Sequence, residues 1–474
     1  MKFYKNFLIV IICSLISGNI FAQDFGFGFD NDDNDLSASG NIGSTTGGGS
    51  AINFSVGGKV SASMIGYIDD FNKGTVSVNL GDIFSGRLNF AAETSIAEGI
   101  INLKIEPSEP ELIKIDEAYA RAFLGNFDIT AGIRKLTWGK ADSMGPLDVI
   151  NPLDTSIIYT EMADNSGLLG VKIARPLIHA SFRLGDFSKL EGVFVPNFEP
   201  HYIPTEGRWT PAQMKMLADI PETITMPPLP MEIPLTAHHI KPDTDSLNYF
   251  QAGLRFTTTV SSSDIGIQYY YGRKHQPAVE IVAVPQIPTN VDVYLNYKYN
   301  PYHQIGIDYA QVLFGFNIRA EAAVNITEDT KGDDGSIYNP NIAWSLGLDR
   351  SLFWGINLNI QANQSIMLFH DKLGSDDFMS VMTEGFDIEG GMSLTSTRVN
   401  FLISKKFFRD ELELRTAFIW GVEDKDCLIM PAIIWTKDNL RFTLAGGFFF
   451  GDSEGQLGQY KDNGFVKISM SYSF

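Results

Sequence analysis

The fold is decided by the last nine residues of the sequence, Val466-Lys467-Ile468-Ser469-Met470-Ser471-Tyr472-Ser473-Phe474. Apolar and polar side chains alternate at every position of this stretch. Successive side chains of a β-strand point to opposite faces, so the pattern predicts a strand with one apolar and one polar face. Transmembrane barrels are built from strands of about 10 residues, apolar toward lipid and polar toward the interior.

The same alternation recurs from residue 52 onward. Its clearest cases are 54–64, 127–134, 250–257, 316–325, 356–363, 411–420 and 440–450. The polar faces carry Arg, Glu and Asn near the strand centres, which favours a wet interior over a sandwich or propeller. Tight turns such as 436–439 alternate with long polar loops such as 326–340, as in outer-membrane barrels. We predict an all-β fold, a transmembrane antiparallel β-barrel of about 16–18 strands.

Charged side chains on the predicted inner face are the candidate lumen-lining residues, because charges in a narrow pore decide which solutes pass. They are Arg134, Arg255, Arg319, Glu321, Arg398, Glu411, Glu413, Arg415 and Arg441. Aromatic residues near strand ends fit the girdles found at membrane interfaces. These are Trp138, Trp344, Trp354, Trp420, Trp435 and Tyr472.

The beginning of the chain predicts export. Residues 1–22 have the form of a secretory signal peptide, with Lys2 and Lys5 before an apolar run that is too short for a comfortable membrane helix. Residues 23–50 form an acidic, Gly-rich tail that we expect to be disordered. The barrel then occupies 51–474. No other stretch approaches 18 consecutive apolar residues, so any membrane span must be a closed barrel.

Charge and cysteine content narrow the partners and the stabilising chemistry. The net charge of −20 becomes −22 once Lys2 and Lys5 are removed, which argues against nucleic acid as a partner and disfavours anionic solutes. The two cysteines are Cys13 and Cys427, and cleavage of the signal peptide removes the first. The mature chain then forms no internal disulfide, so its fold alone must stabilise it.

Residues 113–154 carry three short motifs. Ile115-Asp116-Glu117-Ala118-Tyr119-Ala120-Arg121 is followed by Gly132-Ile133-Arg134-Lys135-Leu136-Thr137-Trp138-Gly139 and by Asp148-Val149-Ile150-Asn151-Pro152-Leu153-Asp154. This segment resembles a poorly characterised porin-like β-barrel family from the outer membrane of diderm bacteria, with E-A-Y, G-R-x-x-x-x-W-G and D-V-x-N-P-x-D motifs. Ile133 separates Gly132 from Arg134, a departure from the family pattern. The resemblance implies location and architecture, and no substrate or catalytic residue.

The end of the chain is similar to the C-terminal assembly signal of bacterial outer-membrane barrels, in which an aromatic residue closes an alternating strand. Tyr472 and Phe474 are the candidate residues of this signal. The similarity implies the barrel-assembly machinery as a partner, besides outer-membrane lipid.

The segment 138–154 follows a predicted strand end. Asn151-Pro152 favours an extended backbone, and Asp148 and Asp154 are suited to cap backbone amides in turns. Two interpretations stay open: a loop folded against the barrel wall, or a loop that narrows the pore.

The Pro-rich insert 199–245 contains nine prolines. Thr210-Pro211 predicts a helix start, with Gln213 to Ala218 following it. The residues 226–235 predict extended polyproline II. The insert is too apolar for a free surface loop, so we expect it at the barrel mouth or in the lumen, where it constricts the pore. With the apolar stretch 279–288 it either lines a site where an apolar solute enters, or the two stretches simply bury each other.

The motifs of enzymes and metal sites are missing from the sequence. The histidines lack metal-ligand spacing, although His201, His238 and His239 share the Pro-rich insert. A catalytic site at the barrel rim would draw on His303 or His370-Asp371. We predict no enzyme activity, no cofactor and no metal. The leading hypothesis is an outer-membrane channel or transporter for small solutes, apolar ones among them. The alternatives are a surface-exposed structural or adhesin-like barrel without transport, and an enzyme at the rim.

Overall fold

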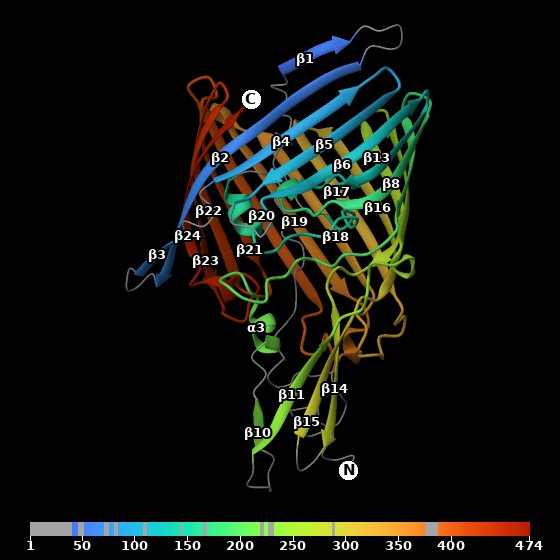
Figure 1. Ribbon diagram of the computed structural model, residues 1–474, viewed down its shortest axis with the longest axis vertical. Helices are drawn as coiled ribbons and strands as arrows, with labels where there is room; N and C mark the ends of the chain where they lie inside the picture. The colour runs from blue at the N-terminus through green and yellow to red at the C-terminus, as the bar shows by residue number, and fades with distance from the viewer. Residues whose placement is uncertain are drawn as a thin grey trace.

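The computed structural model describes residues 40–45, 52–70, 75–79, 84–107, 111–142, 145–164, 168–218, 222–225, 232–286, 290–374 and 387–474. Eighteen strands, each antiparallel to its neighbours, form a closed barrel (Figure 1). In ring order they are β2 (Ile52–Asp70), β4 (Phe84–Glu93), β5 (Ala97–Ile105), β6 (Ile113–Leu124), β7 (Phe127–Arg134), β8 (Arg175–Leu184), β9 (Ser188–Val195), β12 (Gln251–Val260), β13 (Ser263–Arg273), β16 (Pro301–Leu313), β17 (Phe316–Thr327), β18 (Asn341–Ser351), β19 (Ile356–Met367), β20 (Thr395–Phe407), β21 (Leu412–Gly421), β22 (Asp426–Lys437), β23 (Leu440–Gly451) and β24 (Gly464–Ser473). The predicted fold class and strand number are confirmed.

Closure of the barrel depends on the pairing of β24 with β2, which runs from Lys59 opposite Ser473 to Ile68 opposite Gly464. Two further strands, β1 (Gly40–Thr45) and β3 (Thr75–Asn79), also pair with β2. β1 falls in the stretch predicted to be a disordered tail. The remainder of that tail and the predicted signal peptide 1–22 lie outside the described residues.

The two ends of the barrel differ in the length of their connections. The short-turn end carries the turns 94–96, 125–126, 185–187, 261–262, 314–315, 352–355, 408–411 and 438–439, and β24 also ends there. The loop end carries the long connections 135–174, 196–250, 274–300, 328–340 and 368–394. Short turns at one end and long loops at the other are typical of outer-membrane barrels.

The polarity of the barrel wall is the reverse of that of a soluble protein. Leu254, which is 58% exposed, alternates with Arg255, which is 4% exposed, and Ile305 at 54% alternates with Gln304 at 1%. Soluble proteins bury aliphatic side chains and expose charged ones. A wall with apolar side chains outside and polar ones inside needs a hydrocarbon solvent around it, which identifies the strands as membrane-spanning.

This polarity can be tested with one cation on either face of β2. Val60 is exposed on the outer face near the strand centre, and Ser61 beside it is half-buried on the inner face. Val60→Arg is expected to cost about 2–4 kcal/mol of barrel stability if the residue lies near the bilayer midplane. Ser61→Arg places the same charge in the lumen and is expected to fold normally. Urea unfolding in lipid vesicles measures both variants, and equal stability would contradict the assignment of faces.

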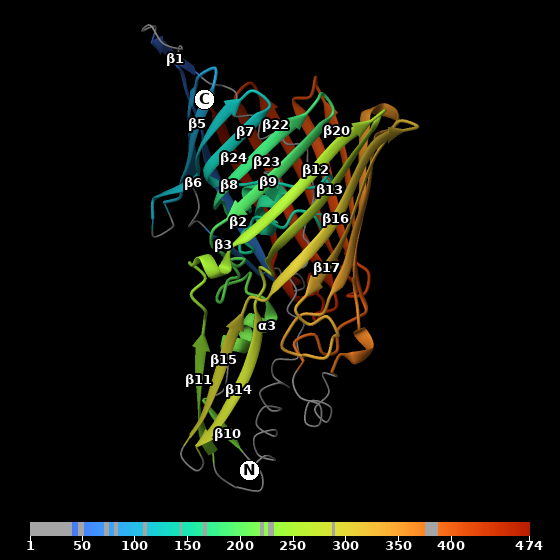
Figure 2. The same ribbon diagram turned by 90° about the vertical axis from the view of Figure 1, so that its right-hand side faces the viewer.

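A second sheet forms an arm that projects from the loop end of the barrel (Figures 1 and 2). Its strands are β10 (Thr223–Thr225), β11 (Glu232–Ile240), β15 (Asn290–Lys298) and β14 (Ala278–Gln286), in that spatial order. β11 is parallel to β15, which pairs antiparallel with β14. The two apolar stretches of the sequence therefore meet in one sheet, where Ile233, Ile281 and Leu295 are buried.

The Pro-rich insert thus lies at the barrel mouth, one of the two places predicted for it. Its predicted helix is confirmed as α3 (Ala212–Ala218). The polyproline prediction is wrong for 232–235, which belong to β11 because their backbone pairs with β15 and β10; residues 226–231 lie outside the described part.

The remaining helices are short. They are α2 (Ile158–Asp164), η2 (Leu168–Gly170), η3 (Leu247–Tyr249), η4 (Phe353–Gly355), η5 (His370–Lys372) and η6 (Gly458–Tyr460). Within the ranges that the structure describes, none of the helices has the length and apolar character to cross a membrane.

Candidate functional site: a segment folded across the barrel interior

The connection between β7 and β8, residues 135–174, folds into the barrel, and we call it the inward segment. Its first part lies against the inner faces of β13, β16 and β17, whereas its helix α2 lies against β21, β23 and β24. In ring order β13 and β24 are on opposite sides of the barrel. The inward segment therefore spans the interior from wall to wall (Figure 1).

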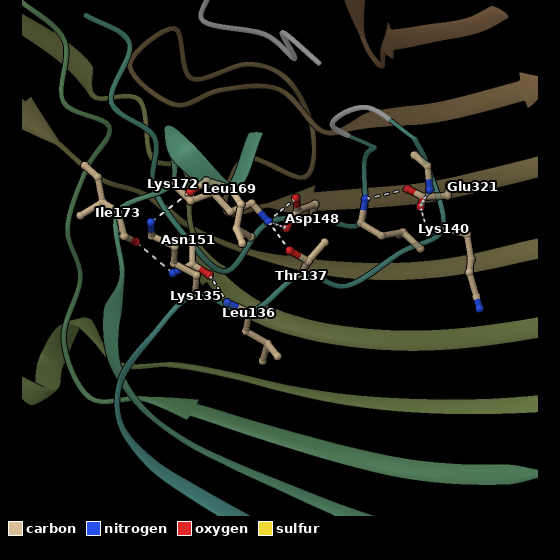
Figure 3. A network of polar contacts seen from close by, with 12 residues as sticks. Lys135, Leu136, Thr137, Lys140, Asp148, Asn151, Leu169, Lys172, Ile173 and Glu321 are labelled. Carbon is tan, nitrogen blue, oxygen red and sulfur yellow. Dashed lines mark hydrogen bonds and ion pairs between the residues drawn. The ribbon is translucent and has the colours of Figure 1, made fainter. Parts of the chain in front are cut away.

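The carboxylate of Glu321, on the inner face of β17, anchors the first part. It accepts hydrogen bonds from the backbone N–H groups of Lys140, of Ala141 at 2.7 Å and of Leu147 at 3.4 Å (Figure 3). Gly139, with a φ of 106°, and Gly145 pack so closely that a Cβ atom at either position would overlap this carboxylate. Glycine at both positions is what allows the chain to wrap around the anchor.

Arg319 of β17 itself and side chains of β13, β16 and β19 add polar contacts around this anchor. Arg319 forms an ion pair with Asp142, whose carboxylate also accepts a hydrogen bond of 2.9 Å from Asn359. Gln268 donates to the carbonyl of Leu147 at 3.0 Å, and Gln304 donates to the carbonyl of Pro146 at 2.9 Å. The inner wall thus satisfies both donors and acceptors of a loop backbone that lies away from bulk water.

Three inner-wall residues hold α2 on the opposite side. Lys467 pairs with Asp164 at 2.8 Å, and Ser469 donates a hydrogen bond of 2.7 Å to the same carboxylate. Arg415 donates to the carbonyl of Ala163 at 3.1 Å. Cations at the carbonyl end of a helix also interact favourably with its dipole.

An apolar cluster completes this second anchor. Ile158, Tyr159 and Met162 of α2 are buried against the inner faces of β21–β24. The contributing wall residues are Ala417, Ile419, Leu428, Met430, Ala432, Ile434, Ala445, Phe449 and Phe465. Trp209 of the Pro-rich insert closes the cluster, with its ring 5.1 Å from that of Tyr159. This sector of the interior is filled by packed side chains, whereas the sequence predicted a wet, polar inner face throughout.

The residues of the sequence motifs fix both ends of the inward segment. Asn151 accepts from the N–H of Leu136 at 2.7 Å and donates to the carbonyls of Arg134 and Ile173 at 3.2 and 2.9 Å. It thereby joins the outgoing and returning strands of the loop (Figure 3). Glu117 accepts from the backbone N–H of Lys135 at 2.9 Å.

Asp148 forms an ion pair of 2.6 Å with the buried Lys172, whose ammonium also donates to Thr137 at 2.6 Å. The predicted role of Asp148 as a turn cap is therefore wrong, because its carboxylate is taken up by the lysine of the returning chain. Asp154 does cap a turn, since it accepts from the backbone N–H of Ser156 at 2.9 Å.

The Pro-rich insert clamps the inward segment from the barrel mouth. Nδ1 of His201 accepts from the backbone N–H of Leu153 at 2.9 Å, and Tyr202 donates its own N–H to the carbonyl of Leu153. The ring of His275 lies 4.9 Å from that of His201. Burial lowers the pKa of His201 to about 4. Burial, with the neighbouring His201 and Arg175, lowers the pKa of His275 well below its ordinary value.

This clamp predicts a dependence on pH. A free histidine titrates near 6.5, so between about pH 6.5 and 4 an undocked loop binds a proton that the docked loop excludes. Docking is therefore strongest above pH 6.5 and weakens as the pH falls. We expect protease cleavage of the inward segment to increase between about pH 7 and 4.5. His201→Asn keeps a hydrogen-bond acceptor that does not titrate, so its cleavage rate is expected to depend less steeply on pH. A cleavage rate of the wild type that does not change with pH would contradict the clamp.

The candidate lumen residues are distributed around the ring. Arg255 pairs with Asp308 at 2.7 Å, and Arg398 donates to Gln456 and lies 3.4 Å from Asp424. Arg134 lies over the ring of Tyr119, and Arg441 donates to the carbonyl of Asp164 at 3.4 Å. Four of them hold the inward segment: Arg319 and Glu321 bind its first part, whereas Arg415 and Arg441 bind α2 on the opposite side of the barrel.

Two of the candidates lie near the short-turn end. Glu413 shares the inner face of β21 with Arg415, whereas Glu411 belongs to the turn before β21 and lies outside the strand.

Of the candidate assembly residues, Tyr472 lies on the outer face of β24. Phe474 exchanges two backbone hydrogen bonds of 2.9 Å with Gly58 of β2.

One aromatic residue differs from its prediction. Trp138 is buried in the interior against Gly253, not placed in an interfacial girdle, because the chain has already turned inward at that point. The histidines considered for a metal or rim site have separate partners: His238 contacts Asp292, His239 contacts Tyr297, and His303 faces outward beside Tyr269. Among the described residues, no group of three or more His, Cys, Asp or Glu side chains is arranged to hold a metal ion.

The sequence analysis missed the apolar anchor of α2, although a signal for it was present. β22 reads Asp-Cys-Leu-Ile-Met-Pro-Ala-Ile-Ile-Trp-Thr-Lys and is apolar on both faces from 427 to 435. A strand that is apolar on both faces is buried on both, which in a barrel requires an apolar partner inside. Lys467 also donates a hydrogen bond of 3.4 Å to the carbonyl of Thr160 in α2, and the sequence gave no comparable signal for this contact.

Comparison with known proteins identifies the family. The family described as "Protein of unknown function (DUF1302)" matches residues 108–384, more than half of the chain, including the whole inward segment. The chain belongs to the DUF1302 family. A search of curated proteins found no match.

The chain is also similar to several solved structures. OccK9 (OpdG) of Pseudomonas aeruginosa has a TM-score of 0.49 at 8% identity, covering 89% of this chain and 98% of its own. The outer membrane channel DcaP of Acinetobacter baumannii has a TM-score of 0.40 at 9% identity, with 89% and 97% covered. OmpF of Salmonella typhi, solved in complex with daunomycin, has a TM-score of 0.42 at 7% identity, with 91% and 100% covered.

Proposed function

We propose that this DUF1302 protein is a channel for small solutes in the outer membrane of a diderm bacterium. The observation that carries the proposal is the closed barrel with exposed aliphatic side chains outside and buried charged and amide side chains inside. Such a barrel is stable only in a bilayer, and its polar interior offers a path for water-soluble molecules. The signal peptide and the terminal assembly signal predicted from the sequence agree with this location.

The inward segment is the element that sets permeability. It spans the interior, and its polar anchor is built from individual hydrogen bonds and ion pairs, not from a continuous apolar core. A loop held in this way releases locally at lower cost than a strand of the wall does. We therefore expect the part of the inward segment that is held by Glu321 to detach briefly from the wall, while α2 stays packed in the apolar cluster.

The solutes that suit this interior are polar. The apolar stretches that the sequence associated with an apolar solute are buried in the arm, outside the barrel wall.

The alternative function is a structural barrel without transport, which the packed sector around α2 favours. An enzymatic role has no support in the arrangement of the candidate rim histidines, which lie on different surfaces.

Solute uptake by vesicles separates the two functions. The purified protein in liposomes is expected to admit small sugars and amino acids more slowly than an open porin does, yet faster than protein-free vesicles. Uptake equal to that of protein-free vesicles, with a barrel shown to be folded by its heat-modifiable migration on gels, would favour the structural barrel.

A further inference from the structure

Four cations stand in one row across the inner wall of neighbouring strands. Lys59 of β2 is directly opposite Arg87 of β4, Arg87 is opposite Lys104 of β5, and Lys104 is opposite Lys114 of β6. All four alternate with exposed apolar residues of the outer face, such as Val60 and Ile113. Directly opposite residues have Cβ atoms about 5 Å apart, and like charges in that arrangement repel each other. We call these four residues the basic row.

The basic row advances along the barrel axis from β2 to β6. Lys59 is also opposite Ser473, the last residue of β24 at the short-turn end. Lys114 is the second residue of β6, at the loop end. Since barrel strands are tilted by about 40° to the axis, a row perpendicular to them advances along the axis. A solute that follows the three interstrand steps of the row therefore moves roughly 9 Å along the axis, in the direction of the loop end.

The acidic groups nearest to Lys59 and Lys104 are shared with cations outside the basic row. Asp116 lies 3.5 Å from Lys104 but only 2.8 Å from Lys135 of the inward segment. The acids nearest to Lys59 are Asp164 and Glu161, and both are already paired with Lys467. Within the described ranges, neither Lys59 nor Arg87 has an ion-pair partner within 4 Å.

We propose that the basic row is an anion path, so that the channel selects small inorganic and organic anions over cations. The proposal rests on the channel function proposed above and specifies its solute class. An anion beside two adjacent cations relieves their repulsion, and a series of such positions lets it move in steps. The negative net charge of the whole chain predicted that anionic solutes are disfavoured. That charge includes residues outside the lumen, so it does not describe the charge that a solute meets along the basic row.

The reversal potential across a planar bilayer in a potassium chloride gradient measures this selectivity. Currents are recorded in the Glu321→Gln background, which loosens the inward segment, with and without Lys59→Gln and Arg87→Gln. We expect chloride selectivity that falls several-fold in the double variant and, to a smaller extent, with Arg87→Gln alone. Lys437→Gln removes one exposed cation beside the short-turn end and is expected to leave the reversal potential unchanged.

Each result bears on a separate step of the inference. A reversal potential that is cation-selective, or that is the same with and without Lys59 and Arg87, would overturn the anion path while leaving the channel intact. Absence of current in every variant, with folded barrels confirmed on gels, would overturn the channel itself and the anion path with it.

Discussion

Glu321→Gln is expected to release the first part of the inward segment and to make openings of the channel much more frequent. The carboxylate accepts from three backbone N–H groups, and an amide of the same shape accepts fewer and presents a donor to the rest. Hydrogen bonds to a charged group contribute about 1.5–3 kcal/mol each. We expect a loss of about 3 kcal/mol in docking, or roughly a hundredfold in the population of the released state.

Single-channel recording in planar bilayers measures this population as open probability. Glu93→Gln is the matched control, because Glu93 is exposed at the end of β4, away from the inward segment. The account would be contradicted if Glu321→Gln and Glu93→Gln left the open probability equally unchanged. Barrel stability is expected to be the same in both, since the wall pairing of β17 is untouched.

Asn151→Ala is expected to unfold the base of the inward segment. The side chain is buried and serves three backbone groups, those of Leu136, Arg134 and Ile173. Each buried backbone group left without a partner costs about 1–3 kcal/mol, so the loss is about 3–5 kcal/mol if water reaches part of the site. The effect is local, because the barrel strands keep their own hydrogen bonds.

Limited proteolysis of the protein in detergent is the measurement for this variant. Cleavage within 135–174 is expected to become fast, while the rest of the barrel stays resistant and serves as the internal standard. Asn151→Asp keeps the acceptor for Leu136 and loses the two donors, so it is expected to lie between the wild type and Asn151→Ala. Resistance of Asn151→Ala equal to that of the wild type would show that the motif residue does not hold the segment.

The barrel could be predicted from the sequence because the alternation of apolar and polar side chains is visible within each single strand. A strand between lipid and a polar interior must alternate, and the alternation of 466–474 or 316–325 is visible without any knowledge of partners. Glu321 was recognised as an inner-face residue for the same reason. The partners of Glu321 could not be predicted, because they are backbone N–H groups of a distant loop. Ala141, for example, precedes Glu321 by 180 residues.

The position of the inward segment depends on contacts between distant parts of the chain. Lys467 and Thr160 are 307 residues apart, and no periodic pattern relates them. The arm was missed for a similar reason, since β11 is parallel to β15 and such pairs are set by topology, not by a local turn. Trp138 was assigned to the membrane interface because a tryptophan after a strand has the same local sequence whether the chain turns outward or inward.

The central claim is that the inward segment, and not the arm, restricts a membrane-spanning pore. The most direct test is the conductance in planar bilayers of a variant in which residues 140–164 are replaced by a short Gly-Ser bridge, compared with the wild type and with a variant lacking β10 and most of β11. Folded barrel content of all three is checked by heat-modifiable migration. The account predicts a large, steady conductance for the first variant and nearly wild-type, mostly closed behaviour for the second. Equal conductance of the wild type and the first variant, both folded, would contradict it.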